Sequence, residues 1–577
     1  MASTPDVLDN ATNRPPLSRA RTYVILSCLF LSLFTAALDF TITAPASPSI
    51  VAAFHSGSAY TWIGSAYLLA NATASPVWGK LSDIFGRKPI LLSAVSVFLI
   101  GSLLCAAAPN MGMFISGRAI QGSGSGGVVI LVNICITDMF DFRRRGMYLG
   151  LTSVVWALAS GIGPVLGGIF TQLVSWRWNW WINLPCCAVT FGVLFWVLDI
   201  DTQNRNQGPS NGEKVSFRLG LKKVDWLGIT LILGVTLMLL LGLNFGGTSF
   251  AWRSPTVICL IIFGAVMVPL FVVSEAKYTQ HPIMPLRLFK KSQNVAALLV
   301  CFCHGFVYIS AFYFIPIFFQ AVKGTSIMMS GVLILPITIV QCLTGIATGF
   351  IIKHTVDPGH YRIPIIIGMT LLTLGFGLFM YIDALTPLTT ICILEALAGL
   401  GVGLNFQSPL IALQDSVDSS DFATATATFG FTRNIATSLS IVMGGVIFQN
   451  GMATANLDTT EFNGADAEAN VDLVASLPMA QRDEVRAAYV NSLRTMWILY
   501  TCVAAVGVGA SCFLLVRGKK EAGTDAEEDI NAALPGGRKA TAQAPGDIVL
   551  RESHGDKCIG DLEGAIQPGQ RVRVYTE

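Results

Sequence analysis

The chain has 577 residues, of which 53% are hydrophobic and only 12% are charged. Soluble globular domains carry roughly 25% charged residues, so this composition excludes a soluble enzyme. The formal net charge of +2 argues against nucleic acid as a partner.

Long apolar runs recur along the chain from about residue 22 to about residue 516. A bilayer core about 30 Å thick needs roughly 20 apolar residues per helix. Backbone groups in lipid must be satisfied internally, which favours helices. The sequence therefore predicts an all-α polytopic membrane protein with fourteen transmembrane helices. Their expected ranges are 22–44, 58–79, 90–108, 112–137, 147–172, 180–199, 227–245, 255–276, 294–317, 330–352, 363–383, 388–414, 428–450 and 494–516.

Basic residues alternate between the two sides of this predicted topology. Lys and Arg gather before residue 22 and in segments 80–88, 143–145, 205–223 and 277–291, all on one side. Because cytosolic loops carry the excess of Lys and Arg, these segments are expected to be cytosolic. An even number of spans then places both termini in the cytosol.

The first span contains one carboxylate, Asp39, within an otherwise apolar run. Burial favours the protonated form of a carboxyl group. Such a group can take and release a proton when its access alternates between the two sides of the membrane. The alternative is a carboxylate that is permanently paired with an arginine.

The loop after the second span, residues 79–88, reads Gly-Lys-Leu-Ser-Asp-Ile-Phe-Gly-Arg-Lys. Its glycines permit a tight turn between helices, and Asp83 and Arg87 are four residues apart, close enough to pair. The plainer interpretation is a basic turn that only fixes topology. The residues of interest are Gly79, Asp83, Gly86, Arg87 and Lys88.

The fourth span contains Arg118, followed by Gln121 and four glycines between residues 122 and 127. An arginine at the centre of a membrane helix costs roughly 2.5–3.5 kcal/mol on insertion scales, so it needs a partner or a watery cavity. The glycines allow close helix approach. A structural arginine tied to backbone carbonyls is the alternative.

The fifth span contains a proline flanked by glycines. Proline inside a helix removes a backbone hydrogen bond and bends the helix, and the glycines let the bent helix pack closely. A generic kinked helix is the alternative interpretation. The residues are Gly161, Gly163, Pro164, Gly167 and Gly168.

The second half of the chain carries scattered polar groups inside apolar runs. They are candidates for lining a central cavity, as Gln121 is in the first half: His304, Gln320, Glu395, Asn405, Gln407 and Arg433. Cys301, Cys303 and His304 raise the alternative of a metal site, but Cys301 and Cys303 would point about 200° apart on one helix. We expect no metal site.

Taken together, these motifs resemble those of the major facilitator superfamily. Residues 79–88 are similar to its signature loop, 118–124 to its Arg-x-x-Gln-Gly-x-Gly motif, and 161–168 to its Gly-x-Gly-Pro-x-x-Gly-Gly element. The Leu-Asp-Phe-Thr-Ile string at 38–42 and segment 176–185 resemble the fourteen-helix drug:proton antiporter branch, including fungal toxin and multidrug efflux carriers.

The resemblance implies roles for the motifs. Asp39 and Arg118 would take part in proton coupling. Residues 79–88 would form a charge-pair latch that is made and broken as the carrier alternates. The proline element at 161–168 is associated with exporters rather than importers.

The resemblance also implies a major facilitator fold with helices grouped as 6+2+6. The expected parts are a cytosolic N-terminal tail (1–21), a six-helix bundle (22–199), a cytosolic linker (200–226), an inserted helix pair (227–276), a cytosolic loop (277–293), a second six-helix bundle (294–516) with an extracytosolic loop (451–493), and a disordered cytosolic tail (517–577).

The expected function is export of small amphiphilic compounds (drugs, toxins or secondary metabolites) in exchange for protons by alternating access. The alternative is a vacuolar or plasma-membrane carrier of basic amino acids or iron chelators on the same fold. The Gly-x-x-x-x-Gly-Lys-[Ser/Thr] motif of nucleotide sites does not occur in the sequence, so an ion gradient must supply the energy. We expect a monomer in the plasma membrane, or alternatively in the vacuolar membrane, whose partners are the substrate, protons and lipid, with no cofactor and no catalytic residues.

Overall fold

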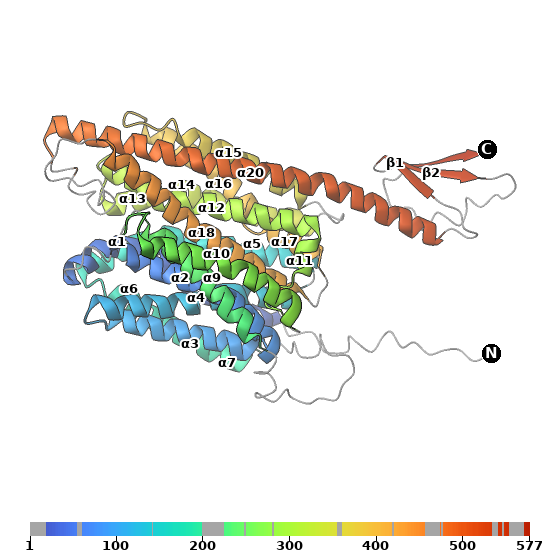
Figure 1. The fold of residues 1–577 in the computed structure, drawn as a ribbon, viewed down its shortest axis with the longest axis horizontal. Helices are drawn as coiled ribbons and strands as arrows, with labels where there is room; N and C mark the ends of the chain where they lie inside the picture. Colours follow the sequence, from blue (N-terminus) through green and yellow to red (C-terminus); the bar gives the residue numbers. More distant parts are fainter. Residues whose placement is uncertain are drawn as a thin grey trace.

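The computed structural model describes residues 19–54, 60–140, 142–198, 224–246, 250–279, 282–354, 361–417, 421–455, 474, 477–533, 540–544, 547–552 and 571–576. Within these ranges the chain consists mainly of long helices that lie side by side along a common direction (Figure 1). Helix α1 (Arg19–Phe54) begins, and helix α20 (Met479–Ala533) ends, toward the same end of the bundle, on the right in Figure 1.

The first half is built from long apolar helices, a last span (Trp178–Val197) that is divided into two helices, and one tight turn. Gly86, between α2 and α3, has a φ of 93°, which favours glycine, and Asn110 caps α4 by accepting a bond from Met113 N. The helices are α1 (Arg19–Phe54), α2 (Tyr60–Phe85), α3 (Arg87–Ala106), α4 (Met111–Met139), α5 (Phe142–Leu173), α6 (Trp178–Trp181) and α7 (Asn183–Val197).

An inserted pair of helices follows and lies over the junction of the two halves. Asp225 caps α9 and Ser254 caps α10, and α9 packs against both α2 and α18 (Figure 1). The elements are α9 (Trp226–Phe245), α10 (Pro255–Val273), the π-helix η2 (Ser274–Tyr278) and the short α11 (Arg287–Lys290).

The second half repeats the pattern of long helices with two breaks. Its elements are α12 (Ser292–Ala321), α13 (Ile327–Leu333), α14 (Leu335–His354), α15 (Arg362–Phe379), α16 (Leu388–Asn405), α17 (Ser408–Asp415), α18 (Phe422–Ala453) and α20 (Met479–Ala533).

Among the described residues, 13 helices are long and apolar enough to cross a membrane. The expected span 58–79 falls in α2, a helix of 26 residues that is not one of these 13. The predicted all-α membrane fold is confirmed, whereas the count of fourteen stays a prediction.

Parts of the segment expected to be a disordered tail, 517–577, are described as helix and strand, and the rest lies outside the described residues. Helix α20 continues to Ala533, and three short strands follow in the order β1 (Ala540–Ala544), β2 (Asp547–Glu552) and β3 (Arg571–Thr576). Residues 519–533 contain Lys, Glu and Ala, which favour helix, and extending an existing helix avoids the cost of nucleation. The same helix begins at Met479, inside the expected extracytosolic loop; most of linker 200–226 and nearly half of loop 451–493 lie outside the described residues.

The two halves touch mainly through two helix pairs, α2 with α18 and α5 with α14. Glycines permit the closest approaches: a β-carbon at Gly79 would lie 2.4 Å from the Ala427 β-carbon, and one at Gly349 would lie 2.9 Å from the Gly146 oxygen. Both contacts lie toward the end of the bundle where α2 ends and α5 begins. We call this end, predicted to be cytosolic, the latch end.

Candidate functional site

The first candidate site is a buried ion pair between α1 and α4. Arg118 Nη1 lies 2.6 Å from Asp39 Oδ2, and the two side chains are 1% and 0% exposed. Arg118 Nε also donates to the backbone oxygen of Ile63 at 3.1 Å. The guanidinium carbon lies 4.4 Å from the centre of the Tyr67 ring, a cation–π distance.

Three amide and hydroxyl side chains complete this cluster. Gln121 Nε2 and Asn183 Nδ2 both donate to Asp39 Oδ1, at 2.8 and 2.9 Å. Gln121 also accepts from Arg118 at 2.7 Å and donates to Ser102 Oγ at 2.7 Å. Buried charges are tolerable only when such bonds satisfy them, and here both oxygens of the carboxylate have donors.

Some members of this cluster were not among the predicted site residues: Tyr67, Ser102 and Asn183. None carries a charge, so none stands out in an apolar run. The available signal was the position of Asn183 within segment 176–185, one of the segments that carry the resemblance. Gln121, expected as a cavity residue, lies in this cluster.

The loop at residues 79–88 forms the second candidate site. Arg87, which is 6% exposed, pairs with Asp83 at 2.5 Å and with Asp138 at the end of α4 at 2.8 Å. It also donates to Ser82 Oγ at 2.7 Å. Arg87 therefore ties the end of α2 to the end of α4, and Asp138 is a partner that sequence reasoning missed.

The same loop reaches the second half of the molecule. Thr424 Oγ1 donates to Asp83 Oδ2 at 3.3 Å, and Gly79 lies against Ala427, both on α18. Lys88 is turned away from this junction: its Nζ lies 5.6 Å from the centre of the Phe195 ring on α7. Gly79 and Asp83 thus lie where the loop meets the second half, whereas Lys88 lies against α7 of the first half.

Other polar contacts join the halves. At the latch end, Arg145 donates to Gln414 at 3.2 Å and Gln414 donates to Thr137 at 3.2 Å. Further along the helices, Asn434 on α18 donates to Asn71 on α2 at 2.8 Å. The halves are therefore held together from the latch end toward the middle of the bundle.

The glycine and proline residues of α5 face two different partners. A β-carbon at Gly163 would lie 2.1 Å from Thr41 Oγ1, and one at Gly167 would lie 2.5 Å from the Ile42 oxygen, both on α1. Pro164 lies against Gly331 of α13, and Gly161 faces Leu335 of α14. A β-carbon at Gly168 would meet no atom of the described residues within 4 Å. Helix α5 thus links α1, close to Asp39, to the second half.

The polar candidates of the second half do not gather in one place. His304 Nε2 lies 3.1 Å from the Val402 oxygen, and Arg433 donates to the Phe406 oxygen and lies over the Phe406 ring. Gln407 reaches the first half, where it donates to Thr152 at 2.7 Å. Gln320 donates to Ser330 at 2.8 Å.

The two remaining candidates of the second half lie on α16. Asn405 packs against Gly368 of α15. Glu395 is 0% exposed, and within the described residues neither of its oxygens has a hydrogen-bond partner.

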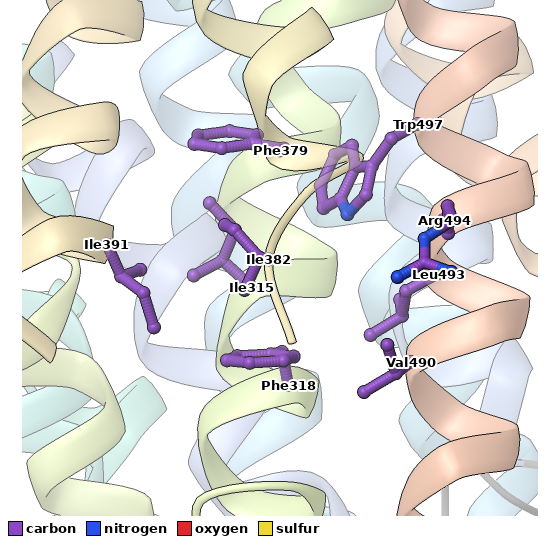
Figure 2. Close-up of a pocket in the computed structure, with 9 residues that line it drawn as sticks. All are labelled: Ile315, Phe318, Phe379, Ile382, Ile391, Val490, Leu493, Arg494 and Trp497. Atoms are coloured by element: carbon purple, nitrogen blue, oxygen red, sulfur yellow. The ribbon is translucent and has the colours of Figure 1, made fainter. Parts of the chain in front are cut away.

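A narrow apolar pocket opens in the second half between α12, α15, α16 and α20 (Figure 2). Its walls include Phe318, Phe379 and Trp497, and Ile391 and the exposed Arg494 lie on opposite sides of it. Sequence reasoning did not predict this pocket, because its lining is contributed by four helices far apart in the chain.

Comparison with known proteins identifies the family. A family model described as "Major Facilitator Superfamily" matches residues 29–227 and 226–441. The chain is 46% identical over 500 residues to "Efflux pump dotC" of Dothistroma septosporum, covering 85% of this chain and 84% of that protein. It is 35% identical over 437 residues to "Efflux pump FUS6" of Gibberella fujikuroi, covering 76% of this chain and 77% of that protein.

A solved structure shows the same fold. The human organic anion transporter MFSD10 (TETRAN) aligns with a TM-score of 0.54 at 15% sequence identity, covering 85% of this chain and 100% of that one. The chain is therefore a multi-pass membrane protein that belongs to the major facilitator superfamily.

Proposed function

We propose that this chain is a secondary active transporter that exports small amphiphilic organic compounds in exchange for protons. The buried Asp39–Arg118 pair carries the proposal. A carboxylate in a dry interior depends on its cation and its hydrogen-bond donors. Adding a proton to Asp39 removes that dependence and weakens the attraction between α1 and α4, so the charge state of Asp39 is coupled to helix packing.

The α5 contacts supply a route from this pair to the rest of the molecule. Thr41, two residues after Asp39, donates to the Ala159 oxygen of α5 at 2.9 Å, and Gly163 and Gly167 keep α5 against α1. On its other side α5 meets α13 and α14 of the second half. A shift of α1 on protonation of Asp39 would therefore move α5 and change its contacts with the second half.

A proton gradient is sufficient as the energy source. One proton moving down 100 mV and one pH unit supplies roughly 3.7 kcal/mol. That free energy supports a substrate gradient of several hundred-fold, on the scale of about 1.4 kcal/mol per factor of ten.

The proposed direction rests on the relatives and on the α5 element, and the proposed substrate class rests on the resemblance of residues 38–42 and 176–185 to drug and toxin carriers. Two of the relatives are named efflux pumps, and the proline element at 161–168 resembles that of exporters. We also propose that the transporter is a monomer in the plasma membrane with both termini in the cytosol. Its energy source would be the proton gradient, and we propose no cofactor.

Proteoliposomes test this proposal. An imposed proton gradient should drive an amphiphilic dye, such as rhodamine 6G or ethidium, against the direction of proton flow. Asp39→Asn and Arg118→Ala should abolish this exchange, whereas Asp483→Asn, which removes a carboxylate that is 77% exposed, should not. Dye that moves in the same direction as the protons would show a symporter and refute the proposed exchange.

A further inference from the structure

The second half contains a buried carboxyl group whose surroundings are the opposite of those of Asp39. Glu395 lies in the middle of α16 and is 0% exposed. Asp39 has an arginine and two amide donors, whereas neither oxygen of Glu395 has a hydrogen-bond partner among the described residues. An ionised carboxylate without donors in a dry interior is far costlier than the neutral acid.

The neighbours of Glu395 along its helix face are apolar. Ile391, one turn earlier, lines the pocket of Figure 2. Ala398, one turn later, packs against Gly375 of α15. Gly399, four residues after Glu395, packs against Ile337 of α14. The packing of α12, α14 and α15 around this stretch therefore offers Glu395 an apolar setting.

The ionisable groups around this stretch lie at its margins. Cys392 is the nearest on α16 itself. On α12, His304 lies at the level of Val402, stacked on Tyr308. Arg494 of α20 lies across the pocket from Ile391, and its Nε donates to the Met380 oxygen.

The remaining neighbouring helices carry their ionisable groups further away. Cys342 of α14 follows Gln341, which contacts Gly403, two turns from Glu395. Arg362 begins α15, and Asp415 ends α17. The described part of the chain places no cation within ion-pairing distance of Glu395.

From this geometry we infer that Glu395 is a second proton-binding site, which holds a proton in the conformation described here and releases it during the transport cycle. The step is the dissociation of the Glu395 carboxylic acid to a carboxylate and a proton, with no other change in bonding. Each six-helix half then carries one exchangeable carboxyl group, Asp39 in the first and Glu395 in the second.

The pocket of Figure 2 suggests where the proton enters. The exposed Arg494 and the buried Ile391 line it from opposite sides. Ile391 and Glu395 are four residues apart, about 6 Å along a helix. A pocket that an exposed side chain lines therefore lies one helical turn from the carboxyl group.

Infrared difference spectroscopy of the full chain tests the site without any substrate. At neutral pH the wild type should show the carbonyl stretch of a protonated carboxylic acid, and Glu395→Gln should lack it. The band should also fade in the wild type as the pH is raised. Glu484→Gln, at an exposed position on α20, should leave the band unchanged. If Glu395→Gln does not fold, Glu395→Leu replaces it, because an apolar side chain suits this setting.

A second measurement, which rests on the proposed function, counts the protons exchanged for each dye molecule. The steady-state ratio of rhodamine 6G concentrations across the membrane should rise with the imposed pH difference, and the steepness of this rise gives the number of protons exchanged per dye molecule. That number should be lower by one in Glu395→Gln than in the wild type. An infrared band that is absent, survives Glu395→Gln or never responds to pH would overturn the site. A dye gradient in the wild type that ignores the pH difference would instead refute proton exchange, and the infrared result would still stand.

Discussion

Arg118 is held by several contacts at once. Its guanidinium meets the Asp39 carboxylate, the Gln121 amide oxygen and the Ile63 carbonyl, and it lies over the Tyr67 ring. A planar group with several fixed donors can serve all of these partners, whereas a lysine ammonium is a compact point charge. The geometry of the pair therefore depends on arginine and not only on a positive charge.

We expect Arg118→Lys to retain the positive charge but to transport poorly. Losing two buried hydrogen bonds costs roughly 2–3 kcal/mol, or about 30- to 150-fold in rate if the loss falls on the transport step. The measurement is the initial rate of proton-driven dye uptake at matched amounts of folded protein. A wild-type rate would show that charge alone is sufficient.

The sequence could reveal the charged members of the site but not the neutral ones. Asp39 and Arg118 are conspicuous because a charge in an apolar run is costly. Ser102, Asn183 and Tyr67 are uncharged, and their bonds depend on how α2, α3 and α7 pack around Asp39. Glu395 is a predicted candidate, yet only the packed helices show that it has no hydrogen-bond partner among the described residues.

Helix α5 contacts α1 on one side and the second half on the other. Gly163 and Gly168 belong to the same sequence element but have different surroundings, since only Gly163 faces α1. This contrast separates the effect of packing from the effect of the motif.

Gly163→Ala should impair transport and Gly168→Ala should not. A β-carbon at position 163 would lie 2.1 Å from Thr41 Oγ1, so α5 and α1 must separate, at a cost of roughly 1–3 kcal/mol. At position 168 the space is open, and alanine favours a helix over glycine by roughly 0.5–1 kcal/mol. Thermal unfolding and dye exchange of both variants decide this, and equal losses would refute the packing argument.

Helix boundaries were harder to predict than the presence of helices. The expected span 388–414 is divided into α16 and α17, with Phe406 and Gln407 outside both. Pro409 lies in the first turn of α17, where its missing N–H is tolerated, whereas in a continuous helix it would leave the carbonyl of Asn405 without a hydrogen bond. The apolar runs on both sides of this break are together long enough for one span, so the pattern alone does not show it.

At the scale of the whole molecule, the described conformation is closed at the latch end. Arg87, Asp83 and Asp138 join the ends of α2 and α4, Thr424 bonds to Asp83, and Gly79 packs against Ala427. Of these contacts, the two with α18 join the halves, and transport by alternating access requires them to be broken and remade.

Gly79→Ala should shift the population away from this closed conformation, and a second change, Ala427→Gly, should restore it. The two β-carbons would lie 2.4 Å apart in the single variant, and removing the methyl group of Ala427 makes room again. The readout is alkylation of a cysteine placed at Thr424, which is 7% exposed in the closed form. Labelling should be faster in Gly79→Ala than in the protein with Gly79, and slower again in the double variant with Ala427→Gly. If the double variant is labelled as fast as Gly79→Ala, the contact between Gly79 and Ala427 is not what closes this end.

The most direct test of the account is the release of protons when substrate binds to the purified protein in weakly buffered solution. Rhodamine 6G, once shown to be exported, should release protons from the wild type as it binds. Asp39→Asn should release one proton fewer for each molecule bound, while Asp483→Asn should match the wild type. The same proton release from Asp39→Asn as from the wild type would contradict the claim that Asp39 carries an exchanged proton.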